Sequence, residues 1–375
     1  MLKAVRHCLW YSSFTVFRIC LKTLSSQSAC GGRLTAAPKA ARKRAKLTEV
    51  LAITDSERAG ACLGPHTVTL LRESQHLSER AVRKYSTATV YFPGTTPPSE
   101  LLASVVLVPG WACGENVMSS WAHFLASHGF VALTIGTLNP FYDMPSRRAA
   151  ALMDAVGALK EEHTRRGSAL QGRLDLDRFA VAGWSMGGGA CQLVALADPT
   201  LRCVIAMTPH PGALLCKSLP EKLTESVPSL FVVGQCDPVA WPCLAHRMYR
   251  AVTAPKMFFE VRRGGHAAAC GPAGGSLFEI PFGYGVCAAC TFTAGMVCGS
   301  CSPLGAFDRP TGRAREVSKY GSIGGVVLKW LRLHLQGDAA DATPAAREEL
   351  AEQLRVRPSI ASTFIACDNA LMTRT

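Results

Sequence analysis

Residues Gly183-Trp184-Ser185-Met186-Gly187 form a Gly-x-Ser-x-Gly motif. In such a motif the serine occupies a sharp strand-to-helix turn, which exposes its hydroxyl at a helix N-terminus. Glycine is needed on both sides because a side chain there would collide with neighbouring backbone. An apolar segment precedes the motif and small residues follow it, which favours a nucleophilic serine over the alternative, a structural turn with an incidental serine.

A serine nucleophile needs a histidine as base, and the histidine needs an acid that orients it. In folds that use this motif the acid and then the histidine follow the serine along the chain, each just after a strand. Asp237 follows the apolar segment 229–233, and His266 follows the apolar segment 256–261. We therefore predict that Ser185, Asp237 and His266 form a catalytic triad.

Other histidines and aspartates are alternatives for the base and the acid. His210 follows an earlier strand and His246 lies on an expected helix, so neither comes after the last core strand. Asp198 and Asp308 are possible acids, but neither directly follows a core strand.

Acyl transfer also needs two N–H donors for the oxyanion that forms at the carbonyl. One is expected from Met186, the residue after the serine. The other is expected from Trp111 in Pro109-Gly110-Trp111, which follows an early apolar segment, although an ordinary turn is the alternative there. This chemistry requires no metal and no organic cofactor.

The elements that would position these residues alternate between strands and helices. Continuous apolar segments rich in valine, such as 101–109, are typical of strands buried on both faces. Alternation of this kind predicts an α/β fold with a mostly parallel sheet and helices on both faces. Strands are expected at 66–71, 87–92, 101–109, 130–135, 179–183, 203–207, 229–233 and 256–261, and helices at 119–127, 147–161, 188–196 and 322–335. The first two strands have no helix between them, which predicts an antiparallel edge.

Residues 267–318 are rich in glycine, cysteine and proline and show no periodicity, so they form a long insert. The insert contains two Cys-x-x-Cys pairs, Cys287/Cys290 and Cys298/Cys301, which could bind zinc through four thiolates. Only seven residues separate the pairs, fewer than the roughly 15–20 of a zinc ribbon. We therefore predict no metal site and interpret the insert as a disordered cysteine-rich loop or a mistaken translation of the gene, with zinc binding as the alternative.

The formal charge of +13 is concentrated in one segment. Residues 1–48 contain ten lysines and arginines and no acid, which leaves +3 for the rest of the chain. The basic segment therefore indicates a solvated targeting leader at 1–63, and we expect no nucleic-acid partner. No apolar run reaches the roughly 18 residues of a membrane-spanning helix.

With these residues identified, the sequence resembles the bacterial cutinases and poly(ethylene terephthalate) hydrolases, relatives of the dienelactone hydrolases in the α/β-hydrolase superfamily. The resemblance covers about 64–266 and 319–369. Its matching stretches include VPGWACGENVMSSWAHFLASHGFVALTIGT, LDRFAVAGWSMGGGA, SLFVVGQCDPVA and STFIACDN.

The resemblance implies an α/β-hydrolase domain at 64–369 without a lid domain, the same triad and the same oxyanion donors. It implies substrate contacts from Trp111, Trp184, His210 and Val239. His210 would replace a tryptophan that stacks on aromatic acyl groups in the family, which favours aliphatic over aromatic esters. The expected protein is a monomeric serine esterase of cutinase or polyesterase type.

The sequence departs from the family pattern at its cysteines. No cysteine follows Cys367 to complete the family's C-terminal disulfide, and a Cys236–Cys270 pair is a hypothesis. The family implies secretion, while the leader leaves an organellar location open. Alternatives are a lipid esterase similar to chlorophyllases or platelet-activating-factor acetylhydrolases, and an inactive binding protein on the same fold.

Overall fold

The computed structural model describes part of the chain. The described residues are 49–50, 63–72, 83–94, 96–97, 100–212, 226–235, 237, 239–261, 265–272, 323–336, 345 and 361–367. Most of the leader, most of the insert with its two Cys-x-x-Cys pairs, and Cys236 lie outside these residues, and what the sequence predicts for them stays a prediction.

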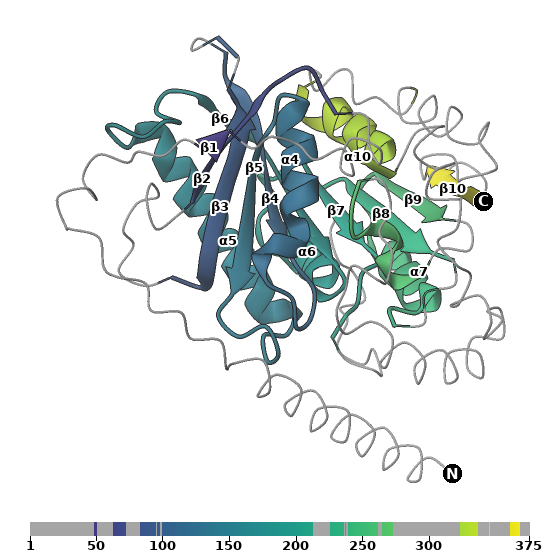
Figure 1. The fold of residues 1–375 in the computed structure, drawn as a ribbon. Coiled ribbons are helices and arrows are strands. Elements are labelled where there is room, and N and C mark those ends of the chain that lie inside the picture. The colour runs from purple at the N-terminus through teal and green to yellow at the C-terminus, as the bar shows by residue number, and fades with distance from the viewer. Residues whose placement is uncertain are drawn as a thin grey trace, which may run out of the picture.

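The described strands form one sheet in the order β1-β2-β3-β5-β4-β6-β7-β8-β9-β10 (Figure 1). The central strands from β5 to β9 are parallel, while β1, β2, β3 and β10 pair antiparallel with their neighbours. Their bounds are β1 Glu49–Val50, β2 Val68–Arg72, β3 Tyr85–Pro93, β4 Leu102–Val108, β5 Val131–Thr137, β6 Leu174–Trp184, β7 Cys203–Met207, β8 Ser229–Gly234, β9 Lys256–Val261 and β10 Ala361–Cys367.

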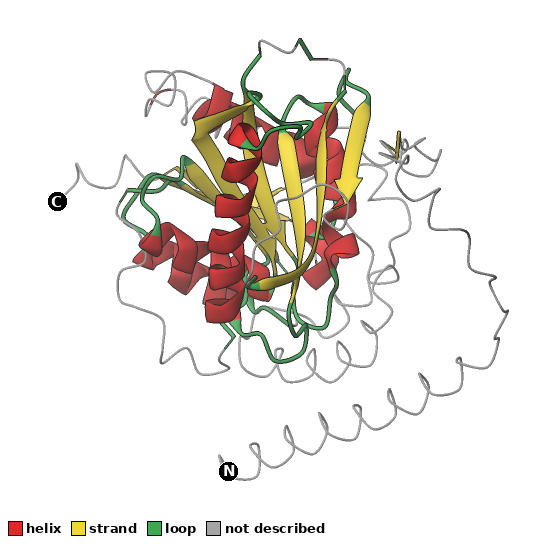
Figure 2. Cartoon of the chain, turned by 90° about the vertical axis from the view of Figure 1, so that its left-hand side faces the viewer, coloured by secondary structure: helices red, strands yellow, loops and turns green. Residues whose placement is uncertain are grey.

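Side-chain alternation along the strands builds a core on each face of the sheet. In β4, Val105 and Leu107 belong to the cluster beneath α4 and α10, whereas Val106 and Val108 belong to the cluster beneath α5 and α6. Helices therefore cover both faces (Figure 2), and the predicted α/β fold with its mostly parallel sheet is confirmed. The helix bounds are α4 Ser119–Ser127, α5 Pro145–Thr164, α6 Met186–Ala197, α7 Pro242–Ala251 and α10 Ile323–Leu331, with short 3₁₀ turns η2 at Glu115–Met118 and η3 at His266–Ala269.

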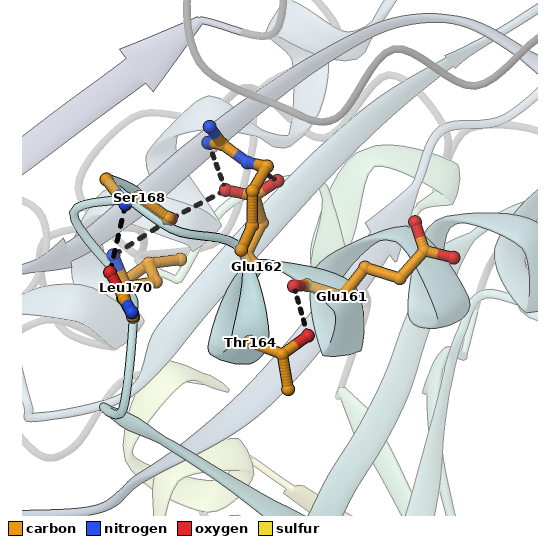
Figure 3. Close-up of polar contacts among 8 residues, drawn as sticks. Glu161, Glu162, Thr164, Ser168 and Leu170 are labelled. Atoms are coloured by element: carbon orange, nitrogen blue, oxygen red, sulfur yellow. Dashed lines mark hydrogen bonds and ion pairs between the residues drawn. The ribbon is translucent and has the colours of Figure 1, made fainter.

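The turn between α5 and β6 is fixed by a buried carboxylate, Glu162 (Figure 3). Its Oε1 accepts a hydrogen bond from Arg165 Nε at 2.8 Å, and its Oε2 accepts one from the Ser168 hydroxyl at 2.6 Å. Ser168 Oγ in turn accepts the Leu170 N–H at 3.1 Å. These bonds satisfy a carboxylate that would otherwise be costly to bury, and they fix the turn that leads into β6, the strand that ends just before Ser185.

Most predicted elements match the observed ones, and β7 and β9 match to the residue. The predicted pairing of the first two strands is also confirmed, although β1 lies outside them. The predicted helix 322–335 is split, because α10 ends at Leu331 and a π-helical turn continues from Arg332 to Gln336. Over the described residues, no helix combines the length and apolar character needed to cross a bilayer.

Candidate active site

Ser185 lies between the last residue of β6 and the first residue of α6. Its backbone has φ 58° and ψ −120°, a combination that residues other than glycine rarely adopt. Three backbone hydrogen bonds hold it there: Ser185 N–H donates to Met207 O at 2.9 Å, and Ser185 O accepts the N–H groups of Gly189 at 3.1 Å and His210 at 2.8 Å. The strained turn is the geometry that the motif predicts, and it leaves Ser185 4% exposed.

The motif glycines are required by close backbone contacts. A Cβ on Gly183 would lie 2.3 Å from the carbonyl carbon and oxygen of Gly187. A Cβ on Gly187 would lie 2.4 Å from the carbonyl oxygen of Val108. Both distances are far below a van der Waals contact, and backbone atoms cannot easily move away. The turn therefore accepts only glycine at these two positions.

The structure brings the three predicted triad residues into one hydrogen-bonded chain. His266 Nε2 lies 2.9 Å from Ser185 Oγ, and His266 Nδ1 lies 2.8 Å from Asp237 Oδ2. Asp237 follows β8 and His266 follows β9, so both stand at the carboxyl end of parallel strands, as does Ser185 after β6. All three side chains are buried. With the Nδ1 proton on the side of the carboxylate, Nε2 can accept the serine proton.

Asp237 makes further bonds through its second carboxylate oxygen. Oδ1 accepts the Val239 N–H at 2.8 Å and the Ala240 N–H at 2.9 Å. Both oxygens thus face donors, which fits an ionised carboxylate acting only as an acceptor. The two N–H bonds also fix the carboxylate plane, so Oδ2 stays directed at His266.

Two buried indoles hold the two ends of the turn that carries His266. Trp184 Nε1 donates to His266 O at 3.1 Å, and Trp121 Nε1 donates to Ala269 O at 3.0 Å. Thr208 Oγ1 also donates to His266 O, at 3.2 Å. The Trp184 ring packs against the imidazole with centroids 4.9 Å apart, and the whole residue is only 3% exposed. Trp184, predicted as a substrate contact, therefore has little surface to offer a substrate and mainly supports His266.

The two predicted oxyanion donors flank Ser185. Met186 opens α6, and Trp111 follows β4 in a loop that runs beside the serine, since a Cβ on Gly110 would lie 2.7 Å from Ser185 Cβ. Within the described residues, neither backbone N–H has a hydrogen-bond acceptor. Trp111 as a residue is 42% exposed, and its Nε1 donates to Phe141 O at 2.9 Å. Both N–H groups are therefore available to a ligand oxygen.

His210 and Val239, the other predicted substrate contacts, lie beside the same centre. The His210 N–H donates to Ser185 O at 2.8 Å, and its Nδ1 accepts the Gly212 N–H at 2.9 Å. Burial lowers the pKa of His210 to about 4; nearby His266 adds to this shift and Asp237 opposes it. His210 is thus neutral near pH 7, with its remaining proton on Nε2.

The alternative residues lie elsewhere. His246 stacks on Phe258 with centroids 4.2 Å apart, and Asp198 accepts bonds from Thr200. Asp308 lies outside the described residues, as do the four cysteines of the Cys-x-x-Cys pairs. No group of three potential ligands among the described His, Cys, Asp and Glu side chains could hold a metal ion.

Two features of the site were not predicted from the sequence. The 138–144 loop exposes four apolar side chains, called the apolar rim below; these are Leu138, Phe141, Tyr142 and Met144. Of these, Phe141 meets the Trp111 ring edge-on. Arg148, in the first turn of α5, is fully buried behind this loop. A signal for Arg148 exists in the sequence, because it lies four residues before Leu152 and thus on the apolar face of its helix.

The chain is similar to a family of PET hydrolase-like proteins and to proteins named as a lipase, a terephthalate ester hydrolase and cutinases. A family model described as PETase, PET hydrolase-like, matches residues 54–276, more than half of the chain. Lipase 1 of Moraxella sp. (strain TA144) is 28% identical over 260 residues, 68% of this chain and 76% of the lipase. The bis(hydroxyethyl) terephthalate hydrolase of Streptomyces coelicolor is 34% identical over 186 residues, 50% of this chain and 54% of that protein. Cutinase 1 of Thermobifida cellulosilytica is 32% identical over 186 residues, 50% of this chain and 64% of the cutinase. The chain thus matches less than two thirds of the length of the last two relatives.

Proposed function

Because the chain belongs to the PET hydrolase-like family of α/β-hydrolases, we propose that it is a serine ester hydrolase that works through an acyl-enzyme. The observation that carries the proposal is the hydrogen-bonded chain from Ser185 through His266 to Asp237, with distances of 2.9 Å and 2.8 Å. In this proposal Ser185 is the nucleophile, His266 the general base and Asp237 the acid that orients it.

The first half-reaction forms the acyl-enzyme. His266 Nε2 takes the Ser185 proton as Oγ attacks the ester carbonyl, and the carbonyl π electrons move onto its oxygen. The Met186 and Trp111 N–H groups donate to that oxyanion, and each such donor contributes about 3 kcal/mol to the transition state. Collapse of the intermediate breaks the bond to the alkoxy oxygen, which leaves as the alcohol with the proton from His266.

The second half-reaction releases the acid. His266 takes a proton from water as the water oxygen attacks the acyl carbonyl, and the same two N–H groups receive the second oxyanion. The Ser185 Oγ bond then breaks, and His266 returns the proton to Oγ. Asp237 stays ionised and stabilises the imidazolium in both halves.

Aliphatic esters are the proposed substrate class. The exposed apolar side chains around Trp111 and Phe141, whose rings meet edge-on with centroids 5.9 Å apart, offer surface for an apolar acyl chain or polymer segment. His210 stands where the family resemblance implies a stacking tryptophan. A neutral imidazole gives an aromatic acyl group less area than an indole, which favours aliphatic over terephthalate esters.

A lipid esterase is the second candidate. It is favoured by the similarity to a protein named as a lipase over 68% of this chain, and by the apolar rim, which suits long acyl chains. An inactive binding protein on the same fold is less well supported, because Ser185, Asp237 and His266 are all present and His266 is hydrogen-bonded to the other two.

The test is hydrolysis of p-nitrophenyl acetate, butyrate and palmitate and of bis(hydroxyethyl) terephthalate by the full chain. Ser185→Ala should lose activity on every ester, whereas Ser120→Ala, an exposed serine on α4, should match the wild type. A preference for butyrate supports the aliphatic esterase, and a preference for palmitate supports the lipid esterase. A folded wild type that hydrolyses none of these esters would leave the binding-protein alternative.

A further inference from the structure

Arg148 is a charged residue in a place that charges rarely occupy. It lies in the first turn of α5 and is 0% exposed. Burial lowers its pKa to about 10, and the nearby Asp143 and Cys113 oppose the shift, so the guanidinium is still protonated at neutral pH. A buried charge is tolerated only where polar groups replace its water.

Three main-chain carbonyl groups replace that water. Arg148 Nε donates to Asp143 O at 2.8 Å, Nη1 to Pro109 O at 3.0 Å, and Nη2 to Pro140 O at 2.9 Å. The Asp143 carboxylate instead accepts the Asn139 N–H at 2.9 Å and lies 3.6 Å from exposed Arg147. The donors of one planar group thus connect two loops, a geometry that a lysine cannot reproduce.

The two loops that Arg148 connects include the loop with Trp111. Pro109 lies two residues before Trp111, and Pro140 O also accepts the N–H of Ala112, the next residue, at 2.9 Å. Ala112 has φ 58°, a left-handed conformation that persists in a residue other than glycine only when its surroundings hold it. The chain is therefore held on both sides of Trp111. Before it, the Pro109 carbonyl group binds Arg148. After it, the Ala112 N–H binds Pro140 O, which Arg148 also binds.

The Pro109 carbonyl also faces the turn that carries Ser185. A Cβ on Gly187 would lie 2.8 Å from Pro109 O, so this oxygen stands between the guanidinium and the motif. Movement of Pro109 would therefore change the position of the Trp111 N–H relative to Ser185.

We propose that Arg148 is a positioning residue of the oxyanion hole, which fixes the Trp111 N–H beside Ser185 by binding the carbonyl groups of Pro109, Pro140 and Asp143. This inference rests on the proposed function, in which that N–H receives the oxyanion. Arg148 itself touches no substrate. Its effect falls on the tetrahedral intermediate, because misplacing a donor weakens a bond that forms only when the oxyanion does.

The test compares Arg148→Lys with Arg147→Lys, the same substitution one residue earlier at an exposed side chain, in the full chain. We expect Arg148→Lys to lower kcat about 10- to 100-fold on p-nitrophenyl butyrate with KM changed less than about threefold. Affinity for an alkyl boronic acid, whose adduct with Ser185 resembles the tetrahedral intermediate, should fall by a similar factor. Arg147→Lys should match the wild type in all three quantities.

A second variant covers the case in which Arg148→Lys does not fold. Asn139 is exposed, and its Oδ1 accepts the N–H groups of Phe141 and Tyr142 at 3.1 Å each, which holds the Pro140 turn. Asn139→Ala should lower kcat and the affinity for the boronic acid about three- to tenfold each, with KM changed little.

The outcomes separate this inference from the proposed function. Unchanged boronic acid affinity in Arg148→Lys, or in Asn139→Ala where only that variant folds, would overturn the positioning role even if the enzyme is active. A loss confined to thermal stability would do the same. Failure of the wild type to hydrolyse any ester or to bind the boronic acid would instead overturn the proposed function, and this inference with it.

Discussion

The indole Nε1 of Trp184 donates a hydrogen bond to the main-chain oxygen of His266 at 3.1 Å. Trp184 is the residue before the proposed nucleophile, and His266 is the proposed base, 82 residues later. The bond therefore joins the end of β6 directly to the turn after β9, and it fixes the backbone from which the imidazole reaches Ser185. A short distance between Oγ and Nε2 depends on this contact as well as on the bond to Asp237.

We predict that Trp184→Phe lowers kcat on p-nitrophenyl butyrate about fivefold with little change in KM. Phenylalanine keeps the ring against the imidazole but loses the donor, while Thr208 Oγ1 still donates to His266 O at 3.2 Å, so the effect stays modest. The free energy of unfolding should fall by about 1 kcal/mol, the usual size for one buried hydrogen bond. Steady-state kinetics and urea denaturation measure the two quantities.

The control for Trp184→Phe is Trp121→Phe, which removes the indole donor at the other end of the same turn, on Ala269 O. Its loss of stability should be similar and its loss of kcat smaller, because Ala269 is three residues away from the imidazole. Equal losses of kcat in the two variants would show that the turn acts as a whole and that the His266 contact has no special part.

We predict that Asp237→Asn lowers kcat about 10³- to 10⁴-fold. Oδ1 accepts two N–H groups and Oδ2 faces His266 Nδ1, so an amide NH₂ would meet a donor in either orientation. The imidazole would respond by presenting a proton on Nε2, where it cannot accept one from Ser185. Kinetics on p-nitrophenyl butyrate, with circular dichroism to establish folding, tests this. A folded variant that keeps more than about a tenth of the wild-type kcat would exclude Asp237 as the orienting acid.

We predict opposite outcomes for two glycine substitutions near the site. Gly183→Ala should destabilise the fold by about 3 kcal/mol or more, because its Cβ would lie 2.3 Å from the Gly187 backbone. Gly265→Ala should change stability by less than about 1 kcal/mol, since among the described residues no atom beyond its chain neighbours lies within 4 Å of its Cβ, and its φ is −91°. Thermal melts compare them. A wild-type melting temperature for Gly183→Ala would mean that the turn has more freedom than these contacts allow.

The sequence predicted well the strands whose burial shows in their composition. β4 and β7 read as continuous apolar runs because both of their faces are covered. Ser185, Asp237 and His266 could be proposed because each follows such a strand, and parallel strands bring their carboxyl ends to one edge of the sheet. β10 could not be predicted as part of the sheet, since its antiparallel pairing with β9 joins residues about 100 positions apart.

The contacts that support the site were hidden from the sequence for a related reason, although the place of Arg148 on the apolar face of α5 indicated its burial. Trp184 and Trp121 each donate one indole N–H to a carbonyl oxygen of another element, and Arg148 donates to three carbonyl oxygens. Residue spacing along the chain carries no information about such contacts, because they depend on how the elements dock. The sequence therefore predicts the reacting groups better than the contacts that position them.

Our last prediction concerns His210 and acid sensitivity. Burial lowers its pKa in the folded protein to about 4, against about 6.5 in an unfolded chain. At pH 7 the imidazole is neutral in the folded protein and mostly neutral in the unfolded chain, so its protonation contributes little to stability. As pH falls below 6.5, His210 binds a proton in the unfolded chain, but in the folded protein it does so only near pH 4. The free energy of unfolding therefore decreases between pH 6.5 and pH 4. Between pH 7 and pH 5 the loss should be about 1–2 kcal/mol.

The variant that isolates this effect is His210→Gln, which has no titrating group at position 210. Urea denaturation of both proteins at pH 7 and pH 5 measures the difference in acid sensitivity, and the protein's other titrating groups contribute to both. We expect the wild type to lose about 1–2 kcal/mol more than His210→Gln between the two values. Equal losses would mean that His210 titrates in the folded protein near its ordinary pKa. The neutral imidazole beside Ser185, on which the argument for aliphatic substrates partly depends, would then be charged at mildly acidic pH.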